Sequence, residues 1–125
     1  MIEAKNELAN FKTIFSNSNY SFYSDHDKSK GGNSYVFRPD KLLETVSACC
    51  MNMWIRMYAD NYGIKLNSVV NHVTVKREIK NEVIFEYNII CQNDLTNDLI
   101  EKLYCVAENS PVRKTLSKKI SFKKG

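Results

Sequence analysis

The residues of this 125-residue sequence that could do chemistry are, first, its four cysteines, at positions 49, 50, 91 and 105. A thiolate is a strong nucleophile, and cysteines in a reducing compartment remain free thiols. The sequence contains no Cys-x-x-Cys pair and no other paired spacing of metal ligands. We therefore expect no metal site and no cofactor, and the question becomes which thiol is reactive.

Cys50 differs from the other cysteines because it falls in the middle of an apolar helix face. At about 100° per residue, Cys50 shares its face with five large apolar residues that form a candidate substrate pocket: Leu43, Val46, Met53, Trp54 and Met57. Thr45, Asn52 and Arg56 fall toward the opposite side. An apolar surrounding disfavours a thiolate, so a reactive Cys50 needs a cation from another element. The candidates are Arg38, Lys5 and Lys12, and without such a cation Cys50 is a buried structural thiol.

The helix that positions Cys50 is predicted within Arg38 to Asn61. Pro39 suits the first helical position, and Asp40 follows near the positive end of the helix dipole. No glycine or proline interrupts the run before Gly63, which we expect to cap its C-terminus. Residues 46–59 are apolar on nearly every side, which predicts a helix that is buried on most sides within the rest of the domain.

Before this helix, residues 8–16 and 19–24 suit two short strands joined by a turn at Asn17-Ser18. Residues 25–37 are a loop by composition, with Gly31-Gly32 as its pivot. The run Asp25-His26-Asp27 lies in this loop and is interpreted as loop rather than as a metal site.

After the helix, residues 66–78 alternate as a strand. A turn near Lys80-Asn81 leads to a second strand, whose apolar face carries Val83, Phe85, Tyr87, Ile89 and a core thiol, Cys91. Thr96 should cap a further helix with a buried stripe, and Cys105 should point away from that stripe. Ser110-Pro111 should begin another helical turn, followed by a closing strand at 119–122. The predicted order is β-β-α-β-β-α-α-β, a single α+β domain of residues 1–125.

Composition and charge exclude several function classes. The net charge is +4, and six basic residues crowd the C-terminal end: Arg113, Lys114, Lys118, Lys119, Lys123 and Lys124. No nucleic-acid recognition motif accompanies them, so we interpret them as a solvated tail and expect no nucleic-acid partner. The charged N-terminus lacks the apolar run of a signal peptide, and the central helix is too polar to span a membrane. We expect a cytoplasmic protein.

Taken together, the motifs resemble the osmotically inducible protein C and organic hydroperoxide resistance superfamily (OsmC/Ohr). The matching segments occur in the order and spacing of the superfamily: Gly31-Gly32 leading to residues 39–43, Ala48-Cys49-Cys50 followed by residues 56–59, two alternating strands, and Ser110-Pro111 continuing to residue 116. The resemblance implies an OsmC-like fold, with a long central helix packed on an antiparallel sheet, in an intertwined homodimer with two sites at the interface.

The resemblance also implies a peroxiredoxin-like thiol peroxidase that acts in oxidative stress. Cys50 matches the reactive cysteine, which attacks the O–O bond of an organic hydroperoxide and becomes a sulfenic acid. Asp40 matches the acidic residue of the network that orients the superfamily's arginine. In the superfamily a second cysteine then forms a disulfide, which an external thiol reductant reduces.

Two positions depart from this pattern. Ser110 stands where the second cysteine is expected, and a hydroxyl cannot form a disulfide. The superfamily's arginine is expected in the N-terminal strands, but the first arginine here is Arg38. Two hypotheses remain: a peroxide-reactive protein that uses Cys50 with an external thiol, or a catalytically silent dimer that binds a hydrophobic small molecule around Met53, Trp54 and Met57.

Overall fold

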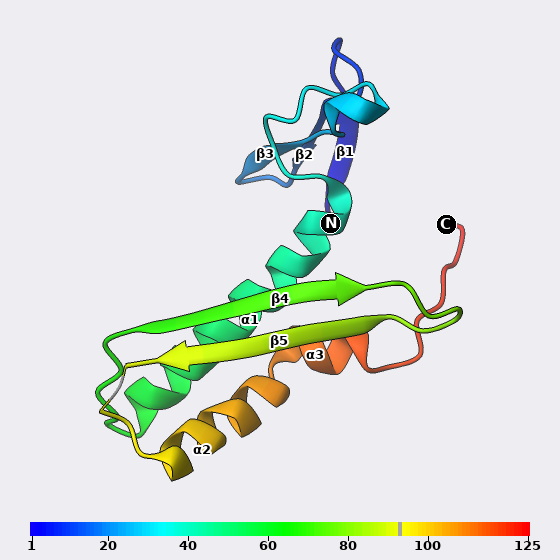
Figure 1. The fold of residues 1–125 in the computed structure, drawn as a ribbon. Coiled ribbons are helices and arrows are strands. Elements are labelled where there is room, and N and C mark those ends of the chain that lie inside the picture. The colour runs from blue at the N-terminus through cyan, green and yellow to red at the C-terminus, as the bar shows by residue number, and fades with distance from the viewer. Residues whose placement is uncertain (93) are drawn as a thin grey trace. The chain divides into compact units, whose positions relative to one another are not determined.

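A computed structural model describes residues 1–92 and 94–125 of the chain, which divide into two compact units, residues 1–43 and 44–125 (Figure 1). The order of elements is β-β-β-α-β-β-α-α, with one short 3-10 turn before the first helix. The α+β class predicted from the sequence is confirmed. The organisation of residues 1–125 as a single domain stays a prediction.

The first unit contains a three-stranded antiparallel sheet in the order β1-β2-β3, formed by β1 (Glu3–Asn6), β2 (Thr13–Ser16) and β3 (Ser21–Ser24). The turn at Asn17 is confirmed, because its side-chain oxygen accepts the N–H groups of Asn19 and Tyr20 at 2.8 Å each. The predicted start of the first strand at residue 8 is wrong. A turn at residues 7–12, closed by the bond from the Glu7 N–H to the Lys12 carbonyl (3.0 Å), leads instead from β1 to β2.

Asp25 organises the loop that follows β3. Its buried carboxylate accepts three backbone N–H groups, from Phe11 (3.1 Å), His26 (2.7 Å) and Asn33 (3.0 Å). The bond from Asn33 is the main reason that the pKa of Asp25 lies below its ordinary value. Gly32 is required here, since a Cβ at this position would lie 2.0 Å from the His26 carbonyl oxygen. The loop also contains the 3-10 turn η1 (Lys28–Lys30).

The long helix α1 (Pro39–Asn61) has the boundaries that the sequence predicts, with Pro39 as its first residue. Gly63 ends it in the left-handed conformation, with φ of 65°. The Ile64 N–H then bonds to the Ala59 carbonyl (2.9 Å), and the Gly63 N–H to the Asp60 carbonyl (3.4 Å). These two bonds form a Schellman motif and confirm the predicted cap.

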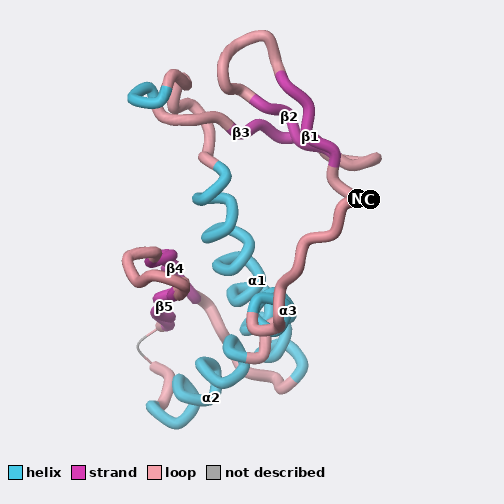
Figure 2. Tube along the Cα trace, turned by 90° about the vertical axis from the view of Figure 1, so that its right-hand side faces the viewer, coloured by secondary structure: helices cyan, strands magenta, loops and turns pink. Residues whose placement is uncertain are grey.

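The second unit packs α1 and α2 (Asn97–Glu108) against the hairpin of β4 (Val69–Lys76) and β5 (Ile84–Cys91), with the strands in front of α1 in Figure 1. The hairpin is antiparallel from the pair Val69 and Cys91 to the pair Lys76 and Ile84. Odd-numbered strand residues face the helices, as the alternation predicts. The core consists of side chains from α1, β5 and α2: Met51, Ile55, Ile89, Leu103 and Ala107. The short helix α3 (Pro111–Leu116) follows α2 (Figure 2).

The prediction that α1 is buried on most sides is wrong for the single chain. Only one face of the helix is fully buried within the second unit, through Ser47, Met51, Ile55 and Ala59. Val46, Met53 and Met57 remain 47%, 54% and 54% exposed. One hairpin and one amphipathic helix cover only one side of a 23-residue helix, and the second apolar face is left without cover.

The predicted closing strand at residues 119–122 is not formed. The segment after α3 pairs with no strand of the described residues, and Ile120 and Phe122 are 57% and 97% exposed. A strand needs an adjacent edge for its backbone hydrogen bonds, and alternation in the sequence does not supply one. Within the described residues, no helix has the length and apolar character needed to cross a membrane.

Two asparagines join α1 to β4. The Asn52 amide donates to the Val69 carbonyl (3.2 Å) and to Asn71 Oδ1 (2.9 Å), and the Asn71 amide donates to the Ala48 carbonyl (2.9 Å). Because Asn52→Ala leaves two part-buried acceptors unpaired, we expect it to lower the free energy of unfolding by about 1–3 kcal/mol in urea titrations. Asn88→Ala, at an exposed position, is the matched control and should change it by less than about 0.5 kcal/mol. Equal losses in the two variants would contradict a joining role for Asn52.

Candidate thiol site on the central helix

Cys50 lies on the side of α1 that the second unit does not cover. It is half-buried, and Val46, Met53 and Met57, at spacings of four, three and seven residues from it, are each about half exposed. Cys50 is therefore not part of the core, whose α1 residues are Met51 and Ile55. A thiol here can meet an apolar substrate without unfolding of the helix.

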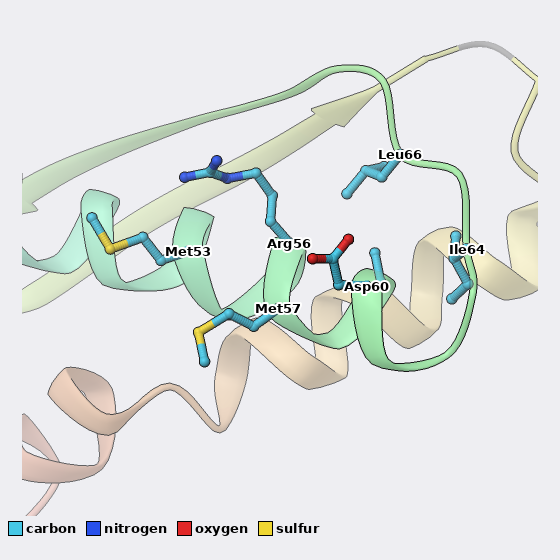
Figure 3. A pocket seen from close by; sticks show the side chains of 7 residues that line it. Met53, Arg56, Met57, Asp60, Ile64 and Leu66 are labelled. Carbon is cyan, nitrogen blue, oxygen red and sulfur yellow. The ribbon is translucent and has the colours of Figure 1, made fainter.

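Three residues of the predicted substrate pocket line two hollows in the second unit. Met53 and Met57 line one of about 390 Å³, together with Arg56 and Asp60 from α1 and Ile64 and Leu66 from the segment after it (Figure 3). Trp54 and Met57 line the other, of about 310 Å³, which also contains Cys105. Leu43 and Val46 line neither of these two hollows.

Arg56, which the helical spacing places away from Cys50, nevertheless borders the first of these pockets. It lines the same pocket as Met53 and Met57 (Figure 3), and its Nε donates to Asn52 Oδ1 at 3.0 Å. A helix of 3.6 residues per turn places positions three apart on adjoining rather than opposite sides. The pocket therefore contains a guanidinium and the carboxylate of Asp60 beside its apolar side chains.

The other cysteines differ from Cys50 in their surroundings. Cys91 packs against the core, as predicted, and burial raises the pKa of its thiol. Cys105 is exposed, as predicted, and Cys49 is exposed as well. The residues that the structure describes contain no group of three His, Cys, Asp or Glu side chains that could hold a metal ion.

Arg38 and Asp40 come together in the first unit. Arg38 Nη2 lies 3.0 Å from Asp40 Oδ2, and Arg38 Nη1 lies 2.7 Å from Asp27 Oδ2. Asp27 first, and then Asp40, raises the pKa of the guanidinium further. The sequence indicated Arg38 as a candidate cation and Asp40 as a member of a polar network, but it did not predict that they pair, nor that Asp27, 11 residues from Arg38, joins them. Cys50 belongs to the second unit.

Ser110 is completely buried directly before α3, and the conformation of its backbone is that of an N-cap, with φ of −62° and ψ of 145°. The predicted position is confirmed, but the predicted cap is not made by the side chain. Ser110 Oγ has no hydrogen-bond partner among residues 1–92 and 94–125. A buried hydroxyl without a partner costs free energy, which an apolar side chain or a thiol would avoid.

A network that the sequence did not predict holds the corner between α2 and α3. Arg113 Nη1 donates to the Tyr87 hydroxyl (3.2 Å), and this hydroxyl donates to Glu108 Oε1 (3.0 Å). The Arg113 guanidinium also lies 5.5 Å from the centre of the Tyr87 ring. Burial is the main cause that raises the pKa of Tyr87. The network ties β5 to Glu108 and Arg113, which lie two residues before and three residues after Ser110. It therefore fixes where Ser110 lies.

Comparisons with known proteins identify the fold. No protein-family model and no curated protein matches the sequence. Among solved structures, a protein of Psychrobacter arcticus assigned to the osmotic stress and detoxification response has 22% identity and a TM-score of 0.75 over 91% of this chain and 85% of that chain. An OsmC-like protein of Mycoplasma pneumoniae has 17% identity and a TM-score of 0.70, covering 93% of this chain and 85% of that chain.

An organic hydroperoxide resistance protein of Elizabethkingia anophelis has 18% identity and a TM-score of 0.68, covering 93% of this chain and 86% of that chain. The protein therefore has the OsmC-like α+β fold, and its resemblance to the OsmC/Ohr superfamily is confirmed in the fold.

Replacing an N-cap serine usually lowers the stability of a protein, but we expect no such loss at Ser110, because its hydroxyl is unpaired. Thr96 Oγ1 accepts the Leu99 N–H at 3.2 Å, so Thr96→Ala should lower the free energy of unfolding by about 1 kcal/mol. Ser110→Ala breaks no such bond and should leave stability unchanged or raise it by up to about 1 kcal/mol. Urea titrations of both variants measure the difference. A loss at Ser110 as large as that at Thr96 would mean that the Ser110 hydroxyl is bonded in solution.

Proposed function

We propose that this protein is a thiol peroxidase that reduces organic hydroperoxides with Cys50. The observation that carries the proposal is the position of Cys50, half-buried on the apolar face of α1 that the chain leaves uncovered. The fold adds support, since the similar solved structures include organic hydroperoxide resistance proteins. The free thiols require a reducing compartment, and we place the protein in the cytoplasm.

In the proposed reaction the Cys50 thiolate attacks one oxygen of the O–O bond. An S–O bond forms, the O–O bond breaks, and the other oxygen leaves as an alkoxide that takes a proton to give the alcohol. Cys50 is oxidised to a sulfenic acid, and the hydroperoxide is reduced. We assign Arg38 the role of the cation that stabilises charge in this reaction, with Asp40 and Asp27 orienting its guanidinium.

An external thiol completes the proposed cycle, because Ser110 cannot form a disulfide. A first thiol attacks the sulfenic acid, releases water and leaves a mixed disulfide on Cys50. A second thiol then attacks this disulfide, which restores the Cys50 thiolate and releases the oxidised reductant. The proposed partners are therefore an organic hydroperoxide and a thiol reductant.

We further propose that the protein acts as a homodimer. The uncovered face of α1 contains three apolar side chains, Val46, Met53 and Met57, each about half exposed, which the same side chains of a second copy could cover. A second copy that packs there would cover this face and complete the surroundings of Cys50.

A second candidate function is the binding of a hydrophobic small molecule by a catalytically silent dimer. The two hollows of about 390 and 310 Å³ beside Met53, Trp54 and Met57 favour it, because their size is that of small-molecule pockets. This candidate differs from the first in one chemical respect: Cys50 stays unmodified when hydroperoxide is added.

The first test is the mass of the reduced protein after one equivalent of cumene hydroperoxide. We expect the mass of one added oxygen, localised to Cys50 by dimedone labelling and peptide mapping, and a mixed disulfide at Cys50 once a small thiol is present. Cys50→Ser should lose both products, whereas Cys49→Ser, its exposed neighbour, should keep them. An unmodified wild-type chain, or oxidation that persists in Cys50→Ser, would contradict the peroxidase and favour the binding protein.

The second test installs the missing cysteine. In Ser110→Cys, peroxide should produce a peptide that links positions 50 and 110 if, as we propose, the two β-carbons can approach to about 4 Å in the geometry of a disulfide. Ser117→Cys is the matched control, since Ser117 lies exposed at the other end of α3. We expect no link from position 117. A folded Ser110→Cys protein without the link would show that Ser110 does not occupy the position of the second cysteine.

A further inference from the structure

The first unit contains a pocket of its own, which the thiol chemistry does not use. It has a volume of about 420 Å³ and lies among residues of β1, β2, the loop after β3 and the start of α1. Its walls are mainly apolar, through Ala4, Phe11, Phe15, Pro39 and Leu42. Four polar residues also line it: Thr13, Ser24, Asp25 and His26.

Three of these four polar side chains already have partners. Thr13 Oγ1 donates to the Phe11 carbonyl (3.1 Å), and Ser24 Oγ donates to the Phe37 carbonyl (2.7 Å). Both carboxylate oxygens of Asp25 accept backbone N–H groups, with Oδ1 bound by Phe11 and His26 and Oδ2 by Asn33. A ligand would therefore find little unused hydrogen-bonding capacity at these residues.

His26 is the exception. Its Nδ1 is buried and has no hydrogen-bond partner in the described part of the chain, residues 1–92 and 94–125. Leaving a buried polar atom unpaired costs free energy. Rotation of the imidazole about its Cβ–Cγ bond exchanges the positions of Nδ1 and Cδ2, and this torsion is broad, so the nitrogen can turn to meet a partner in the pocket.

We propose that this pocket binds a neutral apolar molecule that carries one hydroxyl group, an alcohol or a phenol, and that the hydroxyl pairs with Nδ1 of His26. A hydroxyl both donates and accepts, so it satisfies Nδ1 in either tautomer of the imidazole. The apolar body of the ligand lies against Phe11, Phe15 and Leu42. This site is independent of Cys50 and of the proposed peroxidase.

The charges at the pocket decide against the other ligand classes. A carboxylate would lie beside the Asp25 carboxylate, whose charge repels it. An ammonium group carries three N–H donors and a charge, and three N–H groups already occupy most of the acceptor positions of the Asp25 carboxylate, so it would be only partly paired in apolar surroundings, which is costly. A hydrocarbon without a hydroxyl would leave His26 Nδ1 unpaired.

Fluorescence titration with 1-naphthol tests the proposal, with naphthalene and 1-naphthoate as matched probes. We expect 1-naphthol to bind about tenfold more tightly than either of them, which corresponds to one hydrogen bond. His26→Phe keeps a ring but removes the nitrogen, and it should abolish the preference for 1-naphthol over naphthalene. His72→Phe is the control, because His72 is exposed and its Nδ1 already bonds to Asn88 (2.9 Å). Cys50→Ser should bind 1-naphthol as the wild type does.

A second variant locates the probe whether or not His26→Phe folds. Ala4→Phe, at an exposed position of β1 that lines the pocket, should fill it and weaken 1-naphthol binding at least tenfold. Equal affinity for 1-naphthol and naphthalene, tighter binding of 1-naphthoate, or unchanged binding in Ala4→Phe would each overturn the proposal.

Discussion

The packing of α1 is the constraint on which the rest of the second unit depends. This helix carries apolar residues on more than one side, and the hairpin and α2 cover only the side that contains Met51, Ile55 and Ala59. Full burial of a valine or methionine side chain contributes about 1.5–3 kcal/mol. The half-exposed Val46, Met53 and Met57 therefore represent a gain that the chain alone does not realise. Cys50 lies beside them, so the surface that a second copy would cover also contains the proposed nucleophile.

Apolar packing alone does not determine how the helices and strands of the second unit are aligned, and hydrogen bonds between residues far apart in the sequence fix this alignment. Asn52 and Asn71 hold α1 on β4, and Arg113 and Glu108 hold the α2–α3 corner on Tyr87. In the first unit, the carboxylate of Asp25 gathers three backbone N–H groups from two segments. These hydrogen bonds favour the ionised form of Asp25 and lower its pKa. The ionised carboxylate therefore stabilises the loop at pH values above the ordinary pKa of aspartic acid. This stabilisation is lost as the pH falls from that value through the lower pKa of the folded protein.

Local sequence features predicted the parts of the fold that depend on local physics. Pro39 and Gly63 fixed the ends of α1, Thr96 fixed the start of α2, and strict alternation fixed the inner face of β4 and β5. The same features could not predict β1, whose four residues are all exposed and show no alternation. They also predicted a strand at residues 119–122, where the pattern is right but the described chain offers no adjacent edge.

The sequence predicted which residues form the candidate site, but it predicted less of the contacts that surround each of them. Helical spacing placed Cys50 with Val46, Met53 and Met57, but it could not tell whether this face meets the chain's own sheet or remains open. Pairwise contacts such as Arg38 with Asp27, and the unpaired hydroxyl of Ser110, depend on segments far apart in the sequence. A serine before a proline predicts a cap, yet whether its hydroxyl finds the N–H groups depends on the tertiary surroundings.

The proposed dimer requires that a second copy of the chain covers the open face of α1. Analytical ultracentrifugation of the wild type, with circular dichroism on the same sample, measures this directly. We expect a folded species with the mass of two chains at micromolar concentration. We also expect Met53→Glu to weaken this species and Ile90→Glu not to, because Ile90 is as exposed as Met53 but lies on the outer face of β5. A folded wild-type monomer at micromolar concentration would contradict the dimer.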